Sequence, residues 1–354
     1  MPPIPKKHLP FSAWPLEDRT LWARAFEQDV FDDERTTSHL AAATVTGLRT
    51  SYARYLGFLA NHNPARLELM AETRIDPDSI RAFVAHLRES CRDTSVASLL
   101  HMLRLTLGFL FPKRNWSWLK TVTKRIKAGA IPRGDRARGA TSPELYAIGI
   151  KLMATAEAAL VSSGEITLED ALTLENALTY RDGLIIGLLA AVPLRRRTLT
   201  ALTVNHHLVK TGDRWLLDIP AIDTKTGRPL EFPLPDDLSK RINLYLVRFR
   251  GMIPGANNHH GLWPSTRGRP MDDGSIYDAV RRRTTEALGF PVNLHRFRLA
   301  AGNLWSIADP ANVRGVKDLL GQLSFSTTDK HYIGALSRLA GRALTKVLRP
   351  SRRK

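Results

Sequence analysis

The chain has almost no cysteine. Cys91 is the one cysteine among 354 residues, so an intrachain disulfide is excluded and a reducing compartment is expected. No group of cysteine and histidine has the spacing of zinc ligands. The longest apolar run, residues 183–194, is shorter than the roughly 20 residues that span a bilayer. The first residues lack the apolar core of a signal peptide. These absences predict a cytoplasmic protein with no membrane partner.

Acidic residues are also scarce relative to basic ones. The sequence holds 52 Lys and Arg against 34 Asp and Glu, which gives a formal net charge of +18. Such an excess predicts an acidic partner, and double-stranded DNA is the leading one because neutralised phosphates release condensed counterions. A membrane surface is the weaker alternative, since the basic residues are spread over the whole chain. A hydrophobic fraction of 43% is enough to build a core.

The length and the helical patterns predict two domains. Residues 1–37, rich in Pro and acidic residues, are expected to form an N-terminal arm, either loose or docked. Apolar residues recur at helical spacing over 38–130, which predicts an all-helical domain. Residues 131–141 are basic and rich in glycine, as in a linker. Residues 142–354 then form the second domain, including a helix near its C-terminus.

Local signals refine this picture. In the first domain, Asp76-Pro77 predicts a helix start, and Thr94 is expected to cap the next helix. In the second domain, residues 214–219 and 229–234 are predicted strands, and 224–227 has the composition of a hairpin turn. The expected fold class is therefore mainly α with a small antiparallel β-sheet.

A few polar residues in the second domain could form one site. Two arginines, Arg195 and Arg298, can neutralise a phosphate, and Lys225 can protonate a leaving oxygen. His295 precedes Arg298 by one helical turn, and Tyr332 can serve as a phosphoryl acceptor. Each residue also has an ordinary structural interpretation when it is considered alone. These are a solvated arginine run, an exposed turn lysine, a polar helix start and a packing tyrosine.

Together these motifs resemble the tyrosine recombinase (phage integrase) family. The string PLRRRTLTAL resembles the first arginine box of the family and identifies Arg195. TKTGRPLEFPL resembles its β-hairpin lysine segment, with Lys225, and LHRFR resembles its H-x-x-R box, with His295 and Arg298. LLGQLSFSTTDKHY resembles the ending of the family motif, with Gln322 and Tyr332. Over 38–130 the resemblance to the core-binding domain of the family is only a generic helical pattern.

The resemblance implies a two-domain DNA clamp that performs site-specific recombination, as in phage integrases and other mobile genetic elements. Tyr332 would be the nucleophile that forms a 3′-phosphotyrosine, and Lys225 would protonate the leaving 5′ oxygen. Arg195 and Arg298 would stabilise the transition state, with help from His295 and Gln322. The resemblance implies no metal or organic cofactor, a homotetramer on two DNA sites, and a place at the nucleoid.

Four departures from the family pattern leave other functions open. Gln322 stands where histidine or tryptophan is usual, Thr198 replaces an acidic residue, and Leu299 replaces a second histidine. Tyr332 lies ten residues after Gln322, where nine is common, and His331 takes the usual place. The alternatives are an inactive DNA-binding remnant or regulator of a mobile element, and DNA relaxation like that of a type IB topoisomerase.

Overall fold

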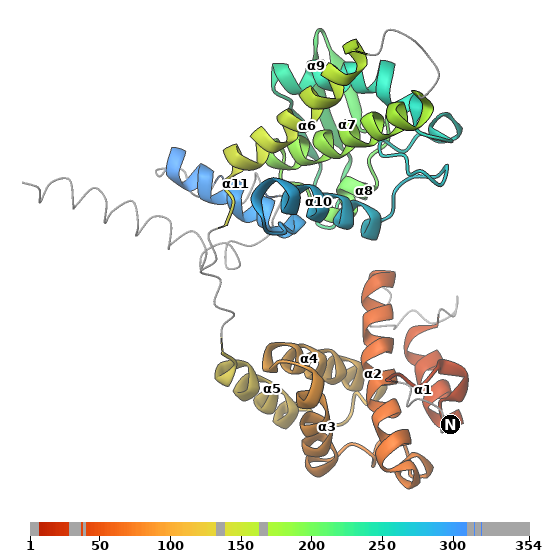
Figure 1. Ribbon diagram of the computed structural model, residues 1–354. Helices are drawn as coiled ribbons and strands as arrows, with labels where there is room; N and C mark the ends of the chain where they lie inside the picture. Colours follow the sequence, from red (N-terminus) through yellow and green to blue (C-terminus); the bar gives the residue numbers. More distant parts are fainter. Residues whose placement is uncertain are drawn as a thin grey trace, which may run out of the picture. The chain divides into compact units, whose positions relative to one another are not determined.

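The chain divides into two compact units. The computed structural model describes residues 7–27, 37, 40–131, 139–162, 169–309, 315 and 320 (Figure 1). The first unit comprises residues 1–135 and the second comprises residues 136–354. Gln322 and Tyr332 lie outside the described residues. No helix in the described ranges is long and apolar enough to cross a membrane.

The first unit is helical throughout its described residues. Its α-helices are α1 (Leu16–Phe26), α2 (Ala42–His62), α3 (Pro77–Ser90), α4 (Asp93–Leu110) and α5 (Ser117–Gly129). The unit also has two short 3₁₀ helices: η1 (Phe11–Ala13) precedes α1, and η2 (Pro64–Glu68) lies between α2 and α3. The apolar faces of these helices enclose one core, in which Tyr52, Leu56 and Leu100 are fully buried.

The described part of residues 1–37 packs onto this core. Trp14 and Trp22 are buried, and the Trp14 ring meets the Tyr52 ring edge-on. Asp18 on α1 is fully buried, accepts a hydrogen bond of 2.6 Å from the Tyr52 hydroxyl, and forms an ion pair with Arg74. An aromatic cluster and a buried ion pair therefore fasten α1 to the other helices of the unit.

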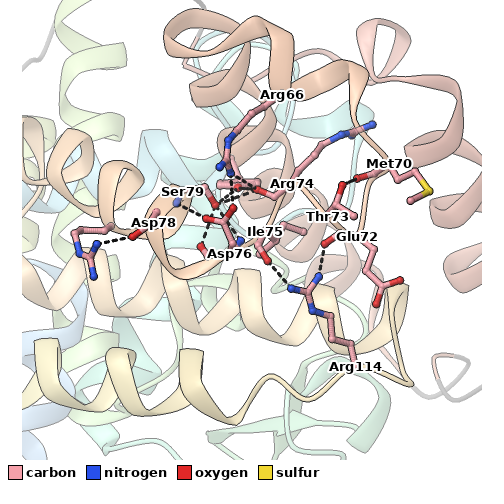
Figure 2. Close-up of polar contacts among 12 residues, drawn as sticks. Arg66, Met70, Glu72, Thr73, Arg74, Ile75, Asp76, Asp78, Ser79 and Arg114 are labelled. Atoms are coloured by element: carbon pink, nitrogen blue, oxygen red, sulfur yellow. Dashed lines mark hydrogen bonds and ion pairs between the residues drawn. The ribbon is translucent and has the colours of Figure 1, made fainter.

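The predicted start of α3 is confirmed. Asp76 is the N-cap, and its side chain accepts a hydrogen bond of 2.7 Å from the Ser79 backbone (Figure 2). The Ser79 hydroxyl accepts from the Asp76 backbone in return, so the two residues form a capping box. The prediction for the next helix was wrong by two residues. Arg92 is the N-cap of α4 and the helix begins at Asp93, so Thr94 already lies inside it.

In its described residues, the second unit combines helices with one small sheet. Its α-helices are α6 (Ser142–Ser162), α7 (Glu169–Ala191), α8 (Arg196–Thr200), α9 (Asp236–Leu244), α10 (Asp273–Leu288) and α11 (Leu294–Ala308). The strands are β1 (Leu208–Thr211), β2 (Arg214–Ile219) and β3 (Leu230–Pro233). Short helical turns complete it: η3 (Ala221–Asp223), the π-helical η4 (Tyr245–Phe249), η5 (Arg250–Met252) and η6 (Ala256–Asn258).

The sheet is antiparallel, with the order β1-β2-β3. Strand β2 coincides with the predicted 214–219, and β3 lies within the predicted 229–234. Strand β1 was not predicted. It pairs with β2 through Thr211 and Arg214, so Gly212 and Asp213 form a two-residue turn in which Gly212 has a φ of 61°. The expected class, mainly α with a small antiparallel sheet, is confirmed.

Close backbone packing fixes the position of α7 against α6. A Cβ atom on Gly149 would lie 2.5 Å from the Gly187 nitrogen, so any side chain there would collide with the α7 backbone. Asp182, on the same helix, is buried and forms ion pairs with Arg181, Arg282 and Arg283. These contacts fix α7 against α6 and α10. The first arginine motif follows α7 in the chain.

Candidate active site

The arginine run begins where α7 ends. Arg195 is the N-cap of α8 in an extended conformation, and its side chain is half-buried. Burial lowers the pKa of the Arg195 guanidinium from its usual value. Arg196 and Arg197 are exposed, and Arg196 forms an ion pair of 3.3 Å with Asp273. Arg195 is therefore the arginine of the three that lies at the buried edge of the unit.

Helix α11 carries the second arginine. The Asn293 side chain caps this helix by accepting from the Arg296 backbone at 3.2 Å. Arg298, in the second turn, is buried, with 8% of its surface exposed. It donates to the carbonyl oxygens of Pro193 and Leu320, the latter at 2.7 Å. Arg298 thus links the residues just before Arg195 to the segment just before Gln322.

His295 lies one turn before Arg298 on the same helix and is exposed. The spacing of three residues places the two side chains on one side of α11. Because His295 is exposed, its imidazole can contact a molecule that binds at the surface of the unit. The buried guanidinium of Arg298 is held in place by its two carbonyl acceptors.

Lys225 lies on the connection between β2 and β3, which is longer than a tight hairpin because it contains η3. The Thr224 hydroxyl closes the turn around Lys225. It donates to the Arg228 carbonyl at 2.8 Å, and the Arg228 backbone donates back to it at 3.1 Å. The Lys225 side chain is exposed and joins no hydrogen bond or ion pair within the described part of the chain. The turn therefore presents an ammonium group to the surface.

The last two predicted site residues, Gln322 and Tyr332, have no described position. The nearest described residue is Leu320, which is buried against Trp305 of α11. The structure thus brings the segment just before Arg195 and the start of the final motif to the side chain of Arg298, with His295 on the same helix. Among the departures from the family pattern, Thr198 is buried and Leu299 is half-buried.

A polar cluster beside this site was missed in the sequence. His206 and His207 follow α8, and Asp223 ends η3. They line a pocket of about 570 Å³ together with Thr203 and His260, among others. Burial lowers the pKa of the His207 imidazole, against the raising effect of Asp223. This is the one group of three or more metal-type ligands found within the described residues. The two adjacent histidines at 206 and 207 were the feature of the sequence from which this cluster could have been predicted.

Comparisons with known proteins were made on both sequence and structure. No protein-family model matches the chain, and no curated protein matches it in sequence. A XerH site-specific recombinase bound to palindromic difH substrate in a post-cleavage complex has a TM-score of 0.57 at 13% identity, covering 85% of this chain and 79% of that chain. XerH bound to difH substrate in a pre-cleavage complex has a TM-score of 0.53 at 13% identity, with 82% and 76% covered. A XerA recombinase has a TM-score of 0.42 at 16% identity, with 87% and 94% covered.

At such low identity the two XerH comparisons establish the fold alone. The chain has a divergent tyrosine recombinase-like fold, as its motifs predicted.

Proposed function

From this fold and the two arginines on adjoining segments, we propose that the protein is a site-specific DNA recombinase. It cuts and rejoins DNA through a 3′-phosphotyrosine on Tyr332. The comparison with XerH, which is bound to difH substrate in both structures, supports DNA as the substrate class. The net charge of +18 supports it independently, because a polyanion is the natural partner of such a surface.

The contacts of Arg298 carry the proposal. One guanidinium donates to Pro193, two residues before Arg195, and to Leu320, two residues before Gln322. Three motifs that are far apart in the sequence thus meet at one side chain. These two bonds orient the guanidinium. An oriented cation beside a second arginine is what a phosphate site requires.

In the proposed cleavage step the Tyr332 phenol loses its proton to solvent water, and its oxygen attacks the scissile phosphorus. A bond forms between this oxygen and phosphorus, and the bond from phosphorus to the 5′ oxygen breaks. Lys225 gives a proton to the departing 5′ oxygen, which leaves as a hydroxyl. Arg195 and Arg298 balance the charge of the pentavalent transition state, and His295 and Gln322 donate hydrogen bonds to its oxygens.

Rejoining reverses the same step. The 5′ hydroxyl of the partner strand attacks the phosphotyrosine, and Tyr332 regains its proton as it leaves. The phosphotyrosine conserves the energy of the phosphodiester bond, so the exchange draws on no nucleotide hydrolysis.

The proposal extends to the arrangement on DNA. The helical unit of residues 38–130 and the unit of 142–354 would grip the duplex from two sides, joined by the basic linker 131–141. Strand exchange between two duplexes needs four cleavages, so four copies of the chain would assemble on two sites. The segment near the C-terminus is the proposed contact between copies. The protein would then act on DNA in the cytoplasm, at the nucleoid.

A trapped covalent complex tests the proposal. Duplexes that bind the full chain are first selected from fragments of the DNA flanking its gene. The selected duplex is then nicked near the cleavage position, so that the short strand departs and the complex cannot reverse. We expect the wild-type chain to form a protein–DNA adduct, and we expect the Tyr332→Phe variant to bind the same duplex without forming one.

The outcomes separate the alternatives. Binding without any adduct from the wild-type chain would identify a DNA-binding remnant or regulator. Adduct formation together with relaxation of supercoiled DNA that lacks the selected sequence would identify a topoisomerase-like activity. An adduct formed equally by Tyr332→Phe would mean that another residue is the nucleophile.

A further inference from the structure

Two histidines and an aspartate converge on one point beside the β2–β3 connection. His206 and His207 lie in the segment after α8, whereas Asp223 ends η3, sixteen residues after His207. The Nε2 atom of His206 lies 3.3 Å from Oδ2 of Asp223, and Nε2 of His207 lies 3.2 Å from the same oxygen. The two imidazole rings meet edge-on, with centroids 4.5 Å apart. The ligand atoms of all three residues lie within 4.8 Å of one another.

The two separations from Asp223 match those of a tetrahedral metal site. With metal–nitrogen bonds of about 2.0–2.1 Å and a metal–oxygen bond of similar length, neighbouring ligand atoms are about 3.3 Å apart. The two separations of 3.2 and 3.3 Å are therefore close to the edges of such a tetrahedron. The remaining position can be filled by water or by His260, which lines the same pocket.

Thr203 provides a partner for the outer nitrogen of His207. Its hydroxyl oxygen lies 3.0 Å from Nδ1 of His207, so it can accept the Nδ1 proton that a metal on Nε2 requires. Without metal, the Thr203 backbone N–H donates to Nδ1 at 3.1 Å, and Nε2 keeps its proton and donates to Asp223. Binding must reverse this tautomer, so we expect weaker binding than at a closed four-ligand zinc site.

We propose that His206, His207 and Asp223 bind a divalent transition-metal ion of the zinc class. Two imidazoles and one carboxylate favour zinc, cobalt or nickel over magnesium and calcium, which prefer oxygen ligands. The ion ties η3 to the segment after α8 and so fixes the base of the turn that carries Lys225. Any effect of the ion on strand cleavage rests on the proposed function, whereas its binding and its hold on η3 do not.

A titration with Zn²⁺ alone tests the site on the full, untagged chain in the absence of DNA. The wild-type chain is freed of metal with a chelator, and heat of binding is recorded as Zn²⁺ is added. We expect one ion to bind at this site, and His206→Ala and Asp223→Asn each to weaken its binding at least tenfold. These two side chains are more exposed than His207, whose replacement could disturb the fold.

A rival histidine cluster in the first unit gives the matched control. The rings of His62 and His86 lie 4.6 Å apart, and Nδ1 of His86 is 3.5 Å from Glu89. We expect His86→Ala to bind Zn²⁺ as tightly as the wild-type chain. Substitution of Co²⁺ for Zn²⁺ should give the visible absorption of a tetrahedral site in wild type and His86→Ala, and should not do so in His206→Ala.

Hydrogen exchange gives a second readout. Zn²⁺ should slow amide exchange over residues 220–228 in the wild-type chain and leave it unchanged in His206→Ala. Tight Zn²⁺ binding that survives both His206→Ala and Asp223→Asn, or that is lost in His86→Ala, would overturn the proposed site. Because no DNA is present, none of these results depends on whether the chain is a recombinase.

Discussion

Each unit contains a buried arginine that joins segments far apart in the sequence, Arg74 in the first and Arg298 in the second, but the two have different acceptors. In the first unit Arg74 is 2% exposed and pairs with the carboxylate of Asp18, which is 0% exposed. In the second unit Arg298 is 8% exposed and donates to the carbonyl oxygens of Pro193 and Leu320. Both arginines join segments that are far apart in the sequence.

The acceptors of the two arginines differ, because one is a carboxylate and the others are carbonyl oxygens. The Asp18 carboxylate neutralises Arg74 and also accepts a hydrogen bond from the Tyr52 hydroxyl. The polar groups of these side chains are therefore paired with one another, and they fasten α1 to the rest of the unit. For Arg298, the carbonyl oxygens of Pro193 and Leu320 hold the guanidinium in a fixed orientation. The buried ion pair of the first unit thus supports the fold, whereas the proposed function assigns the guanidinium of Arg298 to the scissile phosphate.

The largest effect is expected from breaking the ion pair of the first unit. Asp18→Asn leaves the Arg74 charge buried without its main partner, which typically costs about 3–5 kcal/mol. Glu17, 3.8 Å from Arg74, compensates in part, so the lower end is expected. Hydrogen exchange of the full chain should accelerate over α1 and α2 and stay unchanged over α7.

The control for this change is Asp78→Asn. Asp78 forms an ion pair with Arg81, in which both side chains are about four-fifths exposed, at 81% and 78%. Such surface pairs contribute roughly 0–1 kcal/mol. Equal acceleration of exchange in both variants would mean that burial does not make the Asp18–Arg74 pair more important than the exposed pair. The structural role assigned to Arg74 would then be wrong.

The next effect concerns the arginines of the second unit. Arg195→Ala and Arg298→Ala should each slow formation of the covalent adduct by about 100–1000-fold, the loss expected for one preorganised charge stabiliser. Arg298→Lys should recover little, because an ammonium cannot hold two carbonyls in the geometry of a planar guanidinium. Single-turnover cleavage of the nicked duplex measures these rates.

The neighbouring arginines provide matched controls. Arg196 and Arg197 are exposed, and Arg196 forms an ion pair with Asp273 at the surface. Their replacement by Ala should weaken DNA binding more than it slows the cleavage of bound DNA. Equal losses of cleavage rate at all three positions would show that Arg195 has no special place.

A smaller effect is expected at Gln322. If its amide donates to a phosphate oxygen, Gln322→Ala should lose about 1.5–3 kcal/mol of transition-state stabilisation, or roughly one to two decades in cleavage rate. Gln322→His should remain active and gain a pH dependence between about pH 5 and 8, where imidazole changes charge. DNA affinity, measured alongside, should change little. An unaltered Gln322→Ala rate would remove this residue from the site.

The sequence predicted features that local chemistry determines. Strand β2 follows from an apolar run between turn residues, and the start of α3 follows from an aspartate before a proline. The apolar residues on either side of the arginine run indicate that at least one of its arginines lies near the buried edge, and the structure shows that this is Arg195. Strand β1 was missed although Gly212-Asp213 marks a two-residue turn before β2.

The features that were missed depend on contacts across the fold. Asp18 and Arg74 are 56 residues apart, and neither has a local pattern that marks it as buried. Asp223 meets His207 because the sheet brings η3 back to the segment after α8. The roles of all the predicted site residues stay predictions from the motifs, since they depend on a bound DNA strand. These residues are Arg195, Lys225, His295, Arg298, Gln322 and Tyr332.

A double-mutant cycle on Arg195 and Arg298 tests the central claim most directly, because it asks whether both guanidinium groups act on one phosphate. Adduct formation is measured in single turnover for wild type, Arg195→Ala, Arg298→Ala and the double variant, each saturated with the nicked duplex. We predict that the double variant loses clearly less than the product of the two single losses, with a coupling energy of at least about 1 kcal/mol. Losses that simply multiply would contradict a shared phosphate site and leave Arg298 as a structural residue like Arg74.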